Sequence, residues 1–228
     1  MLEAGLFGVG LYTVGEASRL TSMPPVRVRR WLHGYKYVVN GREFRERPIW
    51  SPEIPSINEQ LYLGFRDLVE LRVVNRFRLL GLSLQQLRKA HDIAQELLGE
   101  ERPFSAAAFK TDGTRIYLEI ARRTGEPELI DLLTRQQNFH SVVVPSLRSV
   151  EFDGDVAVRW WPESGAKAVV LDPKRSFGQP IIASAGIPTG VLADAYLAEG
   201  SYARAAAMFG VAARDVKAAV RFQQQIAA

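Results

Sequence analysis

The helical pattern over residues 61–99 limits most strongly what this chain can fold into. Apolar side chains recur there every three or four residues, which predicts a helix with one buried face. They are Phe65, Leu68, Val69, Val73, Phe77 and Leu80. We expect Gly81 to close this helix, Ser83 to cap a second one and Gly99 to close that one. Gly99 and Pro103 end this helical run.

Two short helices are expected before this stretch. Thr13 can cap the first, because Glu16 stands three residues later in the capping-box arrangement. Pro24 and Pro25 forbid continuation of the first helix but suit the first turn of the second. The two segments therefore form a helix-turn-helix candidate, in which the second helix places its exposed face in the major groove.

The second short helix is expected to end at Gly34 and to have one buried and one basic face. Its helical period turns Val28, Trp31 and Leu32 inward. The same period turns Arg27 and Arg30 outward, since they lie at i, i+3 spacing.

Positive charge is concentrated in residues 24–47, which carry seven basic and two acidic side chains, hence +5 against +4 for the whole chain. Asn40-Gly41, between KYVV and REFRE, predicts a two-stranded hairpin that forms a basic wing. Its candidate phosphate-binding residues are Lys36, Arg42 and Arg45. A concentrated basic segment on a near-neutral body is expected of a protein that binds nucleic acid, and the alternative is a solvated charged face.

From Pro103 onwards the pattern indicates β-structure. A hairpin about Asp112-Gly113 is predicted over residues 109–120, followed by a short helix over 127–136. Strands are predicted over residues 139–144, 147–152 and 156–161, the last two joined at Asp153-Gly154.

Three further helices are predicted over residues 191–200, 201–210 and 213–225. The last two have helix-turn-helix spacing, and Arg214, Lys217 and Arg221 form a basic stripe at i, i+3, i+7. A plain helical hairpin with a solvated face explains this pattern equally well.

The adjacent pair Trp160-Trp161 is predicted to lie in a strand, where successive side chains face opposite sides. One ring is therefore expected in the core. The other covers the sheet or anchors an interface, and the interface is slightly favoured.

The string YTVGEASRLTSMPPVRVRRWL resembles the N-terminal motif of the MerR family of transcription regulators, and with the wing and the next two helices the resemblance covers about the first 90 residues. It implies DNA binding and places Arg29 where the family has a basic residue at the end of its recognition helix. The departures are Ser22 at the turn, a longer wing, no long dimerising helix and no cysteine for sensing metal or redox state. The resemblance therefore does not extend to the family's effector mechanism.

The C-terminal part resembles a small bacterial domain family of unknown function. The motifs that carry this resemblance are Asp172-Pro173, Gly178-Gln179-Pro180-Ile181-Ile182, Ile187-Pro188 and Ala198-Glu199-Gly200. That family is usually found in antitoxins encoded beside PIN-like ribonuclease toxins. Together with a MerR-like N-terminal module, the chain resembles the antitoxin of a VapBC-type pair, which implies operator DNA and a toxin as partners.

An enzyme is not expected, because residues suited to catalysis are few. The three histidines, His33, His91 and His140, are widely spaced, and there is no cysteine. Gly8-Val9-Gly10 lacks the third glycine and the preceding strand of a dinucleotide site. We expect no cofactor and no metal. A cytoplasmic location is expected, since no apolar run approaches a membrane span and the N-terminus lacks the basic region of a secretory signal.

The sequence thus predicts an α+β, mainly α fold in three parts. They are a winged helix-turn-helix over residues 1–102, a central β-rich segment over 103–165 and a C-terminal helical domain over 166–228. The candidate partner-binding residues are Trp160, Trp161, Lys174 and Arg175. We expect a homodimer or a larger assembly with the toxin. The alternative is a free-standing transcription regulator with a ligand pocket formed by the central strands.

Overall fold

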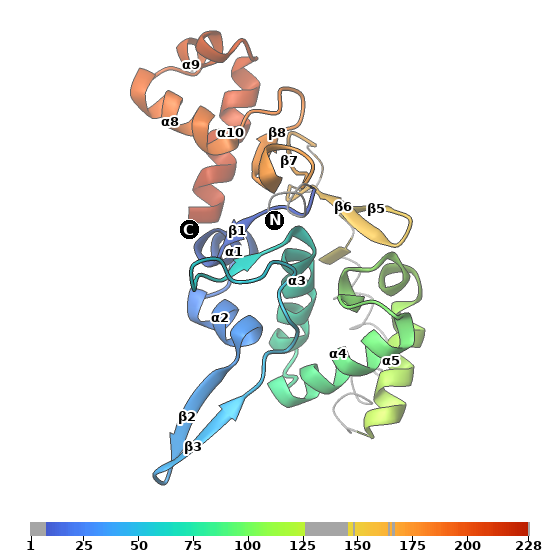
Figure 1. Ribbon diagram of the computed structural model, residues 1–228. Helices are drawn as coiled ribbons and strands as arrows, with labels where there is room; N and C mark the ends of the chain where they lie inside the picture. Colours follow the sequence, from blue (N-terminus) through green and yellow to red (C-terminus); the bar gives the residue numbers. More distant parts are fainter. Residues whose placement is uncertain (1–7, 126–145, 148, 164, 166, 228) are drawn as a thin grey trace. The chain divides into compact units, whose positions relative to one another are not determined.

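The computed structural model describes residues 8–125, 146–147, 149–163, 165 and 167–227, which divide into two compact units (Figure 1). The N-terminal unit consists of residues 13–148 and 152–157, and the C-terminal unit of residues 1–12, 149–151 and 158–228. Each is described by itself below. Helices dominate the described residues and the sheets are small, so the predicted α+β, mainly α class is confirmed.

The N-terminal unit begins with the predicted pair of short helices. Strand β1 (Tyr12–Thr13) leads into α1 (Val14–Thr21), and α2 (Pro25–His33) follows after a turn. The capping box is confirmed: the backbone N–H of Glu16 donates to Thr13 Oγ1 at 3.2 Å, and that of Thr13 donates to Glu16 Oε2 at 2.8 Å. Val28, Trp31 and Leu32 are buried, so the predicted inward face of α2 is also confirmed.

The wing is confirmed as an antiparallel ribbon of β2 (Tyr35–Val39) and β3 (Arg42–Glu46) with Asn40-Gly41 at its tip. After it come the short strand β4 (Tyr62–Leu63) and two helices, α3 (Phe65–Leu79) and α4 (Leu84–Leu98). Ser83 caps α4, since its hydroxyl accepts from the N–H of Gln86, and Gly99 ends the helix in a left-handed conformation. Both roles agree with the sequence.

The hairpin predicted over residues 109–120 is wrong. The 3-10 turn η1 (Pro103–Ser105) leads instead into an 18-residue helix, α5 (Ala107–Thr124), which contains Asp112-Gly113. Phe109, Ile116, Tyr117 and Ile120 are buried. Their spacing is that of one helical face, and burying that face outweighed the turn preference of the Asp-Gly dipeptide.

The boundary predicted at Pro103 does not coincide with the division into units, because η1 and α5 belong with α3 and α4. Phe104 is buried, and its ring centroid lies 5.9 Å from that of Phe77 and 4.8 Å from that of Phe109. These aromatic contacts make Phe104 and the buried face of α5 part of the N-terminal core.

The helix predicted over 127–136 and the strand over 139–144 lie outside the described residues. The next strands, β5 (Val150–Asp153) and β6 (Val156–Trp160), form the predicted hairpin about Asp153-Gly154.

The C-terminal unit contains strands β7 and β8, the ends of β5 and β6 that lie outside residues 152–157, and three helices. The sheet has the order β5-β6-β7-β8, with β7 (Val169–Leu171) and β8 (Pro180–Ile182) antiparallel and the turn η2 (Ser176–Gly178) between them. The three predicted helices are confirmed as α8 (Thr189–Glu199), α9 (Tyr202–Phe209) and α10 (Ala213–Ala227). None of the described helices is both long and apolar enough to span a membrane.

Candidate nucleic-acid interface

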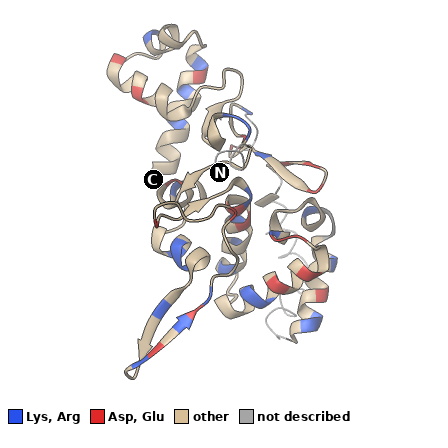
Figure 2. Ribbon diagram, in the orientation of Figure 1, with Lys and Arg blue, Asp and Glu red and all other residues tan. Residues whose placement is uncertain are grey.

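Basic residues occur along α2 and on both strands of the wing, as the ribbon in Figure 2 shows. Arg27, Arg29 and Arg30 are all exposed, while the buried residues of α2 hold the helix against the unit. Seen along α2, Arg27 and Arg30 lie at i, i+3 spacing and share a face. These two arginines therefore form the exposed basic face that the sequence predicts.

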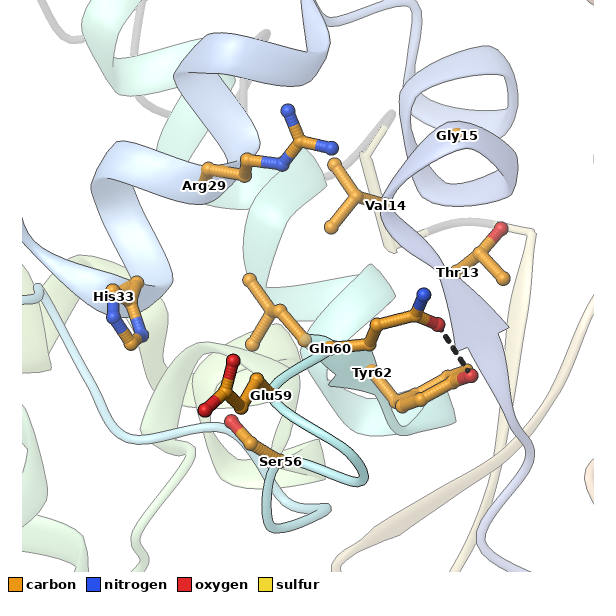
Figure 3. Close-up of a pocket in the computed structure, with 10 residues that line it drawn as sticks. Thr13, Val14, Gly15, Arg29, His33, Ser56, Glu59, Gln60 and Tyr62 are labelled. Carbon is orange, nitrogen blue, oxygen red and sulfur yellow. Dashed lines mark hydrogen bonds between the residues drawn. The ribbon is translucent and has the colours of Figure 1, made fainter.

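Arg29 lies elsewhere on α2. Together with His33, one helical turn later, it borders a cavity of about 390 Å³ whose other sides include Thr13 at the start of α1 and Gln60 and Tyr62 (Figure 3). In Figure 3 the Arg29 side chain extends towards the beginning of α1. The three arginines of α2 therefore form two groups that face different directions.

The predicted phosphate-binding residues of the wing also fall into two groups, because the register of the ribbon places them on opposite faces. Lys36 pairs with Arg45 across the ribbon, so both lie on one face. Arg42 pairs with Val39 on the opposite face. Lys36 also forms an exposed ion pair with Glu43 at 2.8 Å. One face of the wing is therefore charged.

The other face carries exposed aromatic rings that the sequence analysis did not single out. Tyr37 and Phe44 pair across the ribbon, and their stacked ring centroids are 5.4 Å apart. Both side chains are exposed. The alternation of side chains about Asn40-Gly41 was the available signal for them.

The passage from α2 to the wing depends on a glycine. Gly34 has a φ of +74°, and a Cβ at this position would lie 2.3 Å from the carbonyl oxygen of Glu46. Only glycine fits such a close approach in that conformation. Directly after it, the Tyr35 ring centroid lies 5.1 Å from the guanidinium carbon of Arg30. These contacts tie the ribbon to the basic face of α2.

Arg88 on α4 holds the base of the wing. Its side chain is only 9% exposed, and its Nη1 lies 2.7 Å from Glu46 Oε2. Its Nε donates to the carbonyl oxygen of Arg47 at 3.0 Å, and Arg47 itself pairs with Asp92 on α4. No pattern in the sequence identifies Arg88, because its role depends on contacts between segments far apart in the chain.

Replacing Arg88 by methionine should loosen the wing without altering any proposed DNA-contacting residue. If the wing contacts DNA as the sequence predicts, we expect DNA affinity to fall about 3- to 10-fold. The slope of log affinity against log salt should become shallower by about 1–2, because an unfixed wing would lose the phosphate contacts expected of it. Fluorescence anisotropy across a salt series measures both. Lys89→Met, an exposed change on the same helix, is the control. A slope equal to that of the unmodified protein would show that Arg88 does not position the wing.

A buried carboxylate fixes the loop that joins the wing to α3. Asp67 Oδ1 accepts from Trp50 Nε1 at 3.0 Å and from Arg102 Nε at 2.7 Å. Its Oδ2 accepts from the backbone N–H groups of Glu53 and Gly64, each at 2.9 Å. Burial, followed by the charge of Asp67, raises the pKa of Glu53, and Arg102 and Arg66 oppose that rise. Asp67 thus joins three separate segments of the N-terminal unit.

The four predicted partner-binding residues lie in the C-terminal unit in different environments. Trp160 is 4% exposed and belongs to the core, while Trp161 is half-buried with the Lys167 ammonium 5.0 Å from its ring centroid. Arg175 folds back on its own loop, where Nη1 donates to the carbonyl oxygen of Ala183 at 3.3 Å. Lys174 is exposed, and its backbone N–H donates to Asp172 Oδ1 at 3.0 Å. Lys174 and Arg175 are both exposed, and the Arg175 guanidinium is held by its hydrogen bond to Ala183.

Two short helices, a turn and a basic wing define a helix-turn-helix module, and residues 10–91 match a family described as "Putative DNA-binding HTH domain". The chain is 29% identical over 192 residues to "Putative antitoxin VapB45" of Mycobacterium tuberculosis, which covers 79% of this chain and 80% of that protein. It also matches the X-ray crystal structure of Rv2018 from Mycobacterium tuberculosis, with a TM-score of 0.73, 26% identity and coverage of 94% of this chain and 99% of the other. The resemblance to a VapB-type antitoxin with a helix-turn-helix is thereby confirmed.

Proposed function

We propose that this protein is a DNA-binding antitoxin that represses its own operon and neutralises a partner PIN-like ribonuclease. The observation that carries the proposal is the exposed basic face of α2 beside a basic wing. The match of residues 10–91 to a DNA-binding family and the similarity to an antitoxin support it.

In this proposal α2 enters the major groove and presents Arg27 and Arg30 to base edges and phosphates. Lys36 and Arg45 on one face of the wing, and Arg42 on the other, contact the phosphate backbone. Arg29 contacts a phosphate from the cavity that it borders with α1. The protein binds as a dimer, since a single short recognition helix supplies few specific contacts and two-fold proteins match palindromic sites.

The partner is neutralised through electrostatic complementarity. A PIN-like ribonuclease gathers carboxylates around a divalent metal, so a basic side chain can pair with those carboxylates. Lys174, which is exposed on the loop between β7 and β8, is the residue proposed for this contact. Arg175 and the pair Trp160-Trp161 support the loop and the sheet beside it in this proposal.

The experiment that tests the proposal has two readouts. The tagged full-length protein, purified from its native host, should carry a small ribonuclease with it. It should also protect a site upstream of its own gene from nuclease digestion. Co-purification without a protected site would contradict autorepression, and protection without a ribonuclease would contradict the antitoxin role.

Charge reversal at Lys174 should restore RNA cleavage by the co-purified toxin. We expect about tenfold more Lys174→Glu protein to be needed for half-inhibition, since a like charge placed against the carboxylates costs more than 1 kcal/mol. Arg204→Glu, an exposed reversal on α9 of the same unit, should leave inhibition unchanged. Equal inhibition by both variants would exclude Lys174 from the contact.

A further inference from the structure

A second group of basic residues borders a cleft in the C-terminal unit. Four cations, Lys167, Arg214, Lys217 and Arg221, line a cavity of about 470 Å³, which we call the α10 cleft. One carboxylate, Asp215, also lines it and accepts from the backbone N–H of Ala212 at 3.3 Å. Lys167 lies before β7, and the other three cations lie on α10. The cleft belongs to neither the helix-turn-helix nor the loop that carries Lys174.

The three residues on α10 lie on one side of the helix. Their i, i+3, i+7 spacing and a rise of 1.5 Å per residue give a stripe about 10 Å long. Arg214 is 89% exposed, and its nearest carboxylate oxygen, Asp215 Oδ1, is 4.0 Å away. The Lys217 ammonium lies 5.5 Å from the Tyr202 ring centroid. Both side chains are exposed.

The other two cations are held in place by carboxylates. Arg221 makes a forked contact with Glu163, with Nη2 2.9 Å from Oε1 and 3.1 Å from Oε2. The Lys167 ammonium lies 3.0 Å from Glu151 Oε1. These ion pairs order the walls of the cleft and reduce its charge, so Arg214 and Lys217 carry most of the available positive charge.

The lining of the cleft suits a phosphate backbone better than a protein. Its apolar surface comes from Ala168 and Ala218, which are small, whereas protein interfaces depend on large apolar or aromatic anchors. The large exposed apolar side chains of this unit include Leu197 on α8, 76% exposed, and Met208 on α9, 69% exposed, and neither lines the cleft. Phosphate contacts, by contrast, need only exposed cations at regular spacing.

We propose that the α10 cleft is a second DNA-contacting surface, which binds the phosphate backbone of duplex DNA without reading bases. It would add affinity independent of sequence to the contacts proposed for α2 and the wing. The cations that supply this affinity are Arg214 and Lys217, with Lys167 and Arg221 beside them.

The test uses the full-length protein and a fluorescent duplex of random sequence, so that only backbone contacts are measured. With Arg214→Glu and Lys217→Glu together, affinity for this duplex should fall about 10- to 60-fold at about 0.1 M salt. This is the affinity that releasing the counterions of two phosphates contributes at that salt concentration. The slope of log affinity against log salt should become shallower by about 2. The neutral pair Arg214→Gln and Lys217→Gln should give the same change in slope. The melting temperature of both variants should stay unchanged, because the side chains are exposed.

The control is Lys110→Glu with Arg115→Glu, which makes the same change in net charge at exposed positions on α5. It should leave the slope unchanged. An unaltered slope in both α10 variants would overturn the proposal. Polyglutamate serves as a probe for an acidic protein: loss of polyglutamate binding with DNA affinity retained would assign the cleft to such a partner and would also overturn the proposal. Neither outcome bears on Arg27 and Arg30, whose role is tested separately.

Discussion

Replacing Asp67 by alanine should destabilise the N-terminal unit by about 3–5 kcal/mol, the cost of breaking a buried ion pair by removing one partner. Arg102 would keep its charge in a site where its side chain is 5% exposed, without the carboxylate that it now contacts at 2.7 Å. Trp50 and the backbone N–H groups of Glu53 and Gly64 would lose their acceptor as well. Urea unfolding followed by circular dichroism measures the change.

Asp92→Ala is the matched control, because Asp92 also pairs with an arginine, Arg47, but at the surface. Its loss should cost about 0–1 kcal/mol. If the two variants unfold at the same urea concentration, the buried hydrogen bonds and ion pair of Asp67 do not hold the unit together.

Replacing Arg27 and Arg30 together by alanine should weaken operator binding by about 2–6 kcal/mol, since each arginine that contacts a base contributes about 1–3 kcal/mol. The expected slope of log affinity against log salt for the unmodified protein is about −4 to −5, for about five phosphates per protomer, and the double variant should be shallower. Both side chains are exposed, so the melting temperature should change little.

Operator fragments obtained by nuclease protection supply the DNA for this measurement, and the Lys89→Met protein is a suitable control. Affinity within twofold of the unmodified protein would remove α2 from the proposed interface. Weaker binding accompanied by a lower melting temperature would point instead to damage within the fold.

Local signals in the sequence were enough to predict most of the helices and strands of the N-terminal unit. The capping box at Thr13, the prolines before α2 and the Asn40-Gly41 turn each act within a few residues, so they could be recognised without the tertiary structure. The same kind of signal failed at Asp112-Gly113, where the buried helical face of α5 outweighed the dipeptide. The helical period of the buried residues is present there beside the Asp-Gly turn signal.

The candidate site was only partly predictable for a related reason. The exposure of Arg27 and Arg30 follows from the helical period of α2. The roles of Asp67 and Arg88 depend on partners far away in the chain, which no local pattern indicates. The same holds for Arg175, whose guanidinium folds back onto Ala183.

The β5–β6 hairpin supplies residues to both units: 152–157 belong to the N-terminal unit, and the flanking residues 149–151 and 158–160 to the C-terminal unit. Over the part of the chain that the structure describes, the backbone therefore passes between the units four times, at residues 12–13, between 147 and 149, at 151–152 and at 157–158. A single proteolytic cut, or a gene truncated at one point, leaves at least one unit without part of its own chain. Exchanging either unit between related proteins would require splicing the gene at several positions at once. A single recombination event therefore cannot transfer one unit without the other.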